Sequence, residues 1–161
     1  SPHLKPVRIV INALAPGLPN QDLIVSPQHR VMLCSKIARR MFGCAEVLIA
    51  AKKLLIHEGV SVVEDNPAGV EYFHILFEDH QVVYSNGMPT ESLLLGPEVS
   101  KALPPEAIAE IREIFPRLKA AEFEPAPARR IVRKAKKIDQ LVVRHLKNAR
   151  TLFENVAVQD L

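Results

Sequence analysis

The sequence predicts a mainly β fold, an all-β body of short antiparallel strands followed by C-terminal helices. From Pro6 to about Ser92, short apolar runs with β-branched residues alternate with turn formers, whereas beyond Gly96 the apolar residues follow helical spacing. The 161 residues, 48% hydrophobic and 24% charged, suffice for one ordinary domain with a core, or for a compact domain plus an appendage.

Seven apolar runs predict strands, because each is short, rich in β-branched residues and bounded by turn formers. They are residues 7–11, 22–26, 29–33, 46–51, 60–64, 70–77 and 81–85. Proline, glycine and asparagine predict turns at 15–20, 64–69 and 85–89. This spacing favours antiparallel pairing of the strands.

One short helix is predicted at 35–43, where Ser35 provides an N-cap and Gly43 a terminating residue. Another is predicted at 104–115. It begins with proline and an acidic first turn, shows helical apolar spacing and stops at Pro116.

The last part of the chain has a different composition. Residues 124–128 predict a linker, and the helical stretch at 129–150 holds nine lysines and arginines against Asp139 alone. Apolar residues on one helical face make the whole tail, which continues past residue 150, amphipathic; they are Ile138, Leu141, Val142, Ala149, Leu152, Phe153 and Val156. We therefore expect a β domain with a short terminal helix at 1–120, a linker at 121–128 and a basic helical tail at 129–161.

Several classes of protein are disfavoured. No window approaches the roughly 18 apolar residues of a membrane span, and the amino terminus lacks the layout of a signal peptide, so we expect a soluble chain. Cys34 and Cys44 have no zinc-type spacing and are expected to be small buried hydrophobes, although a disulfide between them stays open. We expect no metal and no cofactor.

The stretch VSPQHRV, residues 25–31, places Ser26 three residues before His29 across a proline-containing turn. An imidazole there can donate a proton to a reacting amide, while the hydroxyl orients it or holds the scissile peptide. Further along, His80 stands between two strand-like runs, and Asn86-Gly87 form a turn. Taken one at a time, these residues are better explained as a capping serine, a half-buried histidine and a polar hairpin end.

Together the two blocks resemble the Hint domain shared by hedgehog autoprocessing domains, inteins and bacterial intein-like proteins. Residues 26–29, Ser-Pro-Gln-His, resemble its Thr-x-x-His motif, with Ser26 in the threonine position. Residues 70–92 resemble its carboxy-terminal block, and residues 49–63 more weakly its central segment. The likeness extends to about Leu118 and is greatest to the version found in large, often secreted, bacterial proteins.

The resemblance implies protein self-processing. In the family an amino-terminal cysteine or serine attacks its preceding peptide bond, and the resulting thioester or ester is cleaved or transferred. By position, His29 donates the proton to the departing nitrogen, Ser26 holds the scissile carbonyl or aligns the imidazole, and His80 belongs to the same site. Such a domain acts once rather than as a multiple-turnover enzyme.

The sequence departs from the family pattern in ways that restrict this reading. Nothing before Val25 resembles the family's nucleophile segment. The residues around Ser1, Ser-Pro-His, do not match the motif that surrounds the nucleophile in the family. Glu91-Ser92 occupy the position of a final His-Asn, so splicing by asparagine cyclisation is not expected. We expect an incomplete Hint body that is inactive alone or depends on its own upstream polypeptide or on the missing amino-terminal segment. An exposed strand edge would favour a homodimer.

Two other functions stay open. The chain is alternatively a catalytically degenerate scaffold whose basic helix binds an acidic partner or a membrane surface. Contact of the tail with nucleic acid stays open without direct support, and the lack of aromatics among the basic residues argues against stacking on a single strand. A hydrolase with Ser26 as nucleophile and His29 as base needs an orienting acid, such as Asp22 or Asp79, and an oxyanion site, and the sequence shows neither.

Overall fold

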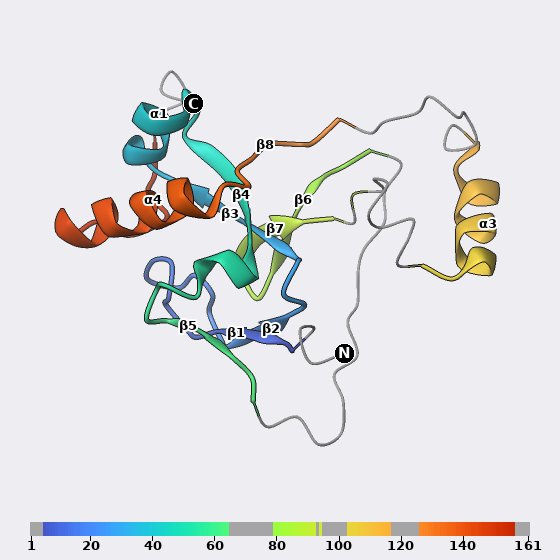
Figure 1. Cartoon of the computed structure of the whole chain (residues 1–161), viewed down its shortest axis with the longest axis horizontal. Helices are drawn as coiled ribbons and strands as arrows, with labels where there is room; N and C mark the ends of the chain where they lie inside the picture. Colours follow the sequence, from blue (N-terminus) through green and yellow to red (C-terminus); the bar gives the residue numbers. More distant parts are fainter. Residues whose placement is uncertain (1–4, 65–78, 93, 95–102, 117–125, 157–161) are drawn as a thin grey trace.

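The computed structural model describes residues 5–64, 79–92, 94, 103–116 and 126–156. The strands of this part form two sheets, one of three strands in the order β2-β1-β5 and one of five in the order β6-β7-β3-β4-β8 (Figure 1). All pairs are antiparallel except that of β4 with β8. The prediction of a mainly β fold with C-terminal helices is confirmed.

The small sheet is centred on β1 (Val7–Ile9), which lies between β2 (Leu23–Val25) and β5 (Val60–Val62). Alternation along β1 buries Val7 and Ile9, while Arg8 faces outward near Asp22, with 3.7 Å between the charged groups. Each of these strands is shorter than its predicted run, although β1 and β5 stay bonded just beyond their ends, where the Val10 N–H donates to the carbonyl of Gly59 and the Val63 N–H to that of Pro6.

The large sheet is centred on β3 (Arg30–Cys34) and β4 (Glu46–Ala50), whose middle residues are apolar without alternation and fully buried. A strand covered on both faces has this pattern. β7 (Met88–Glu91) and β6 (Val82–Ser85) lie on the β3 side, and β8 (Arg130–Ile131) on the β4 side. The predicted strand at 70–77 lies outside the described residues.

β6 and β7 form a hairpin closed by Asn86-Gly87, with Ser85 paired to Met88. Both turn residues have positive φ, 50° and 76°, which is the backbone of the two-residue turn that Asn-Gly favours. This predicted turn is confirmed, and it determines the register of the hairpin.

The helix predicted at 35–43 is confirmed as α1 (Lys36–Phe42). The Ser35 hydroxyl accepts the Ala38 N–H, and Gly43 closes the helix in the left-handed conformation. The helix predicted at 104–115 is confirmed as α3 (Pro105–Ile114), in which no residue is fully buried. A short 3-10 turn, η2 (Ala51–Leu54), follows β4 and was not predicted.

The last helix, α4 (Ala135–Lys147), is shorter than the predicted helical stretch at both ends. Before it, Arg130–Ile131 pair with β4 as β8. After it, Ala149 adopts a φ of 52°, and the chain runs on extended, with the Leu152 N–H bonded to the carbonyl of Leu14. The apolar residues at 149–156 therefore do not continue the face of the helix, because backbone pairing with distant loops replaces it.

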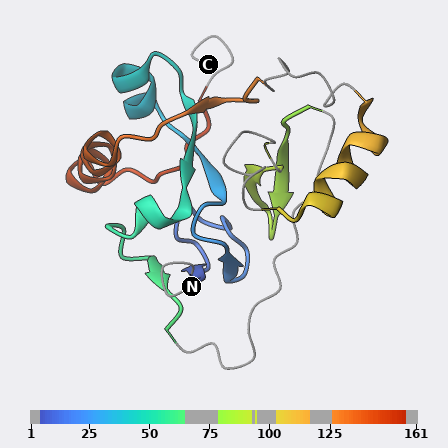
Figure 2. The ribbon, with the colours of Figure 1, turned by 45° about the vertical axis from the view of Figure 1, so that its right-hand side comes forward.

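α4 lies beside α1 at one side of the large sheet, and α3 lies at the other (Figures 1 and 2). Ile138, Leu141 and Val142 of α4 belong to the same buried cluster as Leu33 and Val47 of the central strands. The amphipathic face of the basic helix is thus part of the core. In the described residues, no helix is long and apolar enough to cross a membrane.

Candidate functional site

The turn that carries Ser26 and His29 leads from β2 into β3. The backbone carbonyl of Ser26 accepts the N–H of His29, 3.1 Å away. The η2 segment anchors the turn, because the Lys52 N–H bonds to the carbonyl of Pro27 and the Ala51 N–H to that of His29. Ser26 is joined to His29 through this backbone, so the proline turn brings the two predicted residues together.

The imidazole of His29 reaches across to β7. Its Nε2 lies 2.9 Å from the carbonyl oxygen of Glu91, and the ring is half-buried. Because a carbonyl oxygen only accepts hydrogen bonds, Nε2 must carry the proton. His29 therefore donates this hydrogen bond and polarises the carbonyl of Glu91.

Strand register explains why this contact forms. β3 and β7 pair at Val31 and Thr90, and extending that antiparallel register places Arg30 opposite Glu91 and His29 opposite Ser92. His29 lies just before β3 begins. Its side chain adds a hydrogen bond to β7 at the point where the backbone pairing of the two strands has ended.

The Glu91 side chain forms a largely buried ion pair with Arg30, with 3.3 Å between Nη1 and Oε1 and side-chain exposures of 8% and 18%. Burial raises the pKa of the Glu91 carboxyl to about 7, although Arg30 acts in the opposite direction. A carboxyl group that titrates near neutral pH thus lies next to the carbonyl that His29 contacts.

His80 lies just before β6 and is buried. Its Nδ1 accepts the backbone N–H of Ala128, 2.8 Å away, so the neutral ring carries its proton on Nε2. That Nε2 is buried without a hydrogen-bond partner among the described residues. Burial, followed by the charge of Arg30, lowers the pKa of His80, so the ring is a neutral donor at physiological pH.

Ser92 completes the end of the β6–β7 hairpin. Its N–H donates to the Gln81 carbonyl and its Oγ accepts the Gln81 N–H, both at 2.8 Å. The Ser92 hydroxyl thereby accepts the Gln81 N–H in place of a backbone carbonyl, at the point where the pairing of β6 with β7 ends.

The structure thus brings together, at the peptide group of Glu91 and Ser92, the residue before β3, the residue before β6 and the end of β7. Of the residues singled out from the sequence, His29 contacts this group directly, Ser26 belongs to the turn that holds His29, and His80 precedes the residue that pairs with Ser92. Arg30 and Ala128 were not foreseen. A charged residue at the start of the apolar run 30–34 was the one available signal for Arg30.

The cysteines lie away from this group. Cys34 is buried at the end of β3, and burial, then Glu46 and Glu154, raises the pKa of its thiol to about 11. A thiol with so high a pKa is a poor nucleophile at neutral pH. Cys44 is half-buried, and both are free thiols. The described residues contain no group of three or more His, Cys, Asp or Glu able to hold a metal ion.

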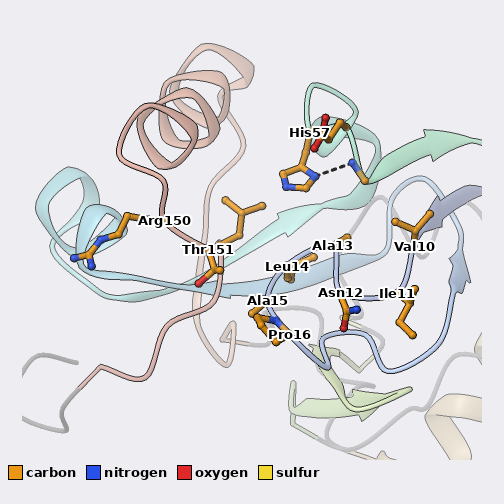
Figure 3. Close-up of a pocket in the computed structure, with 13 residues that line it drawn as sticks. Val10, Ile11, Asn12, Ala13, Leu14, Ala15, Pro16, His57, Arg150 and Thr151 are labelled. Carbon is orange, nitrogen blue, oxygen red and sulfur yellow. Dashed lines mark hydrogen bonds between the residues drawn. The ribbon is translucent and has the colours of Figure 1, made fainter.

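A separate open pocket of about 640 Å³ lies on another part of the surface (Figure 3). It is formed by the loop 10–16, the turn 57–59 and residues 150–152. His57 points into this region, with its Nδ1 accepting the Gly59 N–H (Figure 3). The pocket shares no lining residue with the group around His29.

Comparison with known families identifies one match. The family model described as the Hint domain matches residues 1–97. No curated protein and no solved structure matches the chain. The matched range contains Ser26, His29, His80 and the peptide group of Glu91 and Ser92, and stops before α3.

Proposed function

Because the chain belongs to the Hint domain family, we propose that it is a self-processing domain that cleaves a peptide bond through an amino-terminal acyl shift. The observation that carries this proposal is the protonated Nε2 of His29, which lies 2.9 Å from a backbone carbonyl. A half-buried imidazole that donates to a peptide group is suited to activating one.

In the proposed reaction a cysteine or serine attacks the carbonyl carbon of its preceding peptide bond. A C–S or C–O bond forms, the C–N bond breaks, and His29 donates a proton to the departing nitrogen, while the proton released by the attacking thiol or hydroxyl restores the neutral imidazole. Ser26 holds the scissile carbonyl or aligns the imidazole. By the resemblance to the family His80 belongs to the same site, and its neutral, buried ring carries a proton on Nε2.

We assign the attacking residue to the chain's own upstream polypeptide or to a separate amino-terminal Hint segment. Cys34 does not fit the role, because it is buried and its raised pKa keeps it as a thiol. The proposal therefore includes dependence on complementation, and each molecule acts once.

The test compares the chain alone with the same chain preceded by its genomic upstream sequence, with and without an added thiol, and follows cleavage by mass. We expect cleavage in the extended protein and a loss of roughly 100-fold or more in His29→Ala, since a positioned general acid typically contributes that much. His57→Ala is the matched control, because His57 lies in the separate pocket. An extended protein that carries the family's nucleophile segment, a cysteine and phenylalanine followed by a Gly-Thr turn, and stays intact would exclude self-processing.

One observation favours a second function, binding of an acidic partner. The apolar face of α4 is buried in the core, so the side that α4 presents to solvent is basic and includes Lys136, Lys137 and Lys147. Burial of the apolar face leaves little of it for insertion into a membrane, which favours an acidic protein over a lipid surface.

Binding to an acidic polypeptide such as polyglutamate tests this function. We expect affinity to fall steeply with salt and to weaken in the double variant Lys136→Gln, Lys137→Gln, while Lys5→Gln, in an exposed ion pair with Glu64 on the small sheet, leaves it unchanged. Affinity that is independent of salt, or no binding at low salt, would reject this function.

A further inference from the structure

The peptide bond between Glu91 and Ser92 is contacted from both sides. On the β3 side its carbonyl oxygen lies 2.9 Å from the Nε2 of His29. On the β6 side the N–H and the Oγ of Ser92 are both bonded to Gln81 at 2.8 Å. A polarised carbonyl is thus followed directly by a serine that is 1% exposed and whose hydroxyl is held by a hydrogen bond.

From this arrangement we propose that the bond between Glu91 and Ser92 is itself a reacting bond, at which Ser92 serves as the nucleophile. Its Oγ attacks the carbonyl carbon of Glu91; the Oγ–C bond forms and the C–N bond breaks. The hydroxyl proton passes to the Ser92 nitrogen, which becomes an amine. This rearrangement from amide to ester neither gains nor loses atoms.

Hydrolysis of the ester by water then separates residues 1–91, ending in a new carboxyl group at Glu91, from residues 92–161, beginning with the free amine of Ser92. The reaction uses the same histidine as the upstream cleavage but a different bond and nucleophile. It therefore goes beyond the proposed function and does not depend on it.

The charges around the bond favour the attack. The carbonyl oxygen becomes an oxyanion in the tetrahedral intermediate, and the donor already 2.9 Å away is His29. The positive charge of Arg30 is offset by the Glu91 carboxylate with which it pairs, so the donor at the carbonyl is the imidazole of His29. Since Ser92 and Glu91 are buried, these interactions act with little screening by water.

The same hairpin contains a serine without these contacts. The Oγ of Ser85 is hydrogen-bonded to the Oγ1 of Thr90, 3.2 Å away. The preceding residue, Tyr84, is 74% exposed. The bond between Tyr84 and Ser85 thus provides an internal reference for the chemistry of an ordinary serine peptide.

The experiment incubates the full 161-residue chain with hydroxylamine, which traps an ester as a hydroxamate, and analyses fragments by mass under denaturing conditions. Denaturation is necessary because residues on both sides of the cut belong to one core, so that cleaved halves would stay together. We expect cleavage between Glu91 and Ser92 and none between Tyr84 and Ser85. His29→Ala lowers the rate roughly 100-fold, as loss of an oxyanion donor does, and His57→Ala leaves it unchanged.

Two substitutions at the nucleophile make the test decisive, and thermal unfolding verifies that each variant folds. Ser92→Ala is expected to remove the cleavage, whereas Ser92→Cys is expected to form a thioester that an added thiol cleaves. Wild-type and Ser92→Cys proteins that both stay intact would overturn the proposal, as would equal cleavage in Ser92→Ala. Upstream cleavage yields a different fragment in the extended protein, so either reaction can fail while the other is observed.

Discussion

At the scale of single residues, Glu91 is a side chain whose charge state the fold alters clearly. It faces Arg30, yet burial outweighs that partner and raises the pKa of the Glu91 carboxyl from 4.5 to about 7. The ionised pair is consequently not a net source of stability at neutral pH. It places a titrating group beside the carbonyl contacted by His29.

The raised pKa predicts how stability changes with pH. Between pH 4.5 and 7 the folded state binds more protons at Glu91 than the unfolded state, so the free energy of unfolding falls as pH rises through this window. We expect Glu91→Gln to remove this fall, worth up to about 3 kcal/mol, in urea unfolding measured at pH 5 and pH 8.

Two comparisons isolate this effect. The pKa values of His57, His80 and His145 are lowered by burial and contribute the opposite slope near pH 6, but they are common to both proteins and cancel in the difference. Glu64→Gln, at an exposed ion pair with Lys5, serves as the control and should keep the wild-type slope. If Glu91→Gln has that slope too, the carboxyl is not buried as described.

At the scale of secondary-structure elements, Ser35 joins two helices that are far apart in the sequence. Its Oγ accepts the Ala38 N–H as the N-cap of α1 and donates to Nε2 of His145 in α4, 2.8 Å away. His145 in turn donates its Nδ1 proton to the Leu141 carbonyl. All polar atoms of this buried chain are thereby satisfied.

Removing the hydroxyl breaks both contacts at once. We expect Ser35→Ala to lower the free energy of unfolding by about 2 kcal/mol, from the lost cap and the buried imidazole left without its donor. Ser61→Ala, an exposed serine in β5, should change it by less than about 0.5 kcal/mol. Urea unfolding of both variants measures the difference, and equal effects would show that the cap and the link to α4 contribute nothing.

The elements also show where local patterns are reliable. The caps of α1 and the Asn-Gly turn were predicted because each depends on residues at most a few positions apart. β8 and the end of α4 were not. The β-branched residues Ile131 and Val132 form too short a run between basic residues to predict a strand, and Arg130 and Ile131 join the sheet by pairing with β4.

At the scale of the whole molecule, the chain closes on itself through its last described segment. β8 pairs with β4, α4 packs against α1 and η2, and residues 152–154 bond to Leu14 and Cys34. Ala128, at the start of this segment, bonds to His80. The carboxy-terminal residues consequently help to complete both the core and the surroundings of the candidate site.

Two leucines of α4 test this integration. Leu141 is fully buried, whereas Leu146 on the same helix is 78% exposed. We expect Leu141→Ala to destabilise the whole chain by roughly 2–5 kcal/mol in a single cooperative transition, and Leu146→Ala by less than 0.5 kcal/mol. Thermal unfolding measures the loss of stability, and native-state hydrogen exchange measures the protection of the amides in β3 and β4. If Leu141→Ala leaves protection in those strands unchanged, α4 unfolds independently of the body.

The sequence alone determined the strand-rich class, most element positions in the described residues, and the turn that holds Ser26 and His29 close together. Hydrophobic period, turn residues and helix caps act over a few positions and can be recognised in one dimension. The tertiary structure decided what His29 contacts, which residue pairs with Arg30, and what binds His80. Those partners lie 62, 61 and 48 residues away, and strand register and burial, which depend on the whole fold, bring them together.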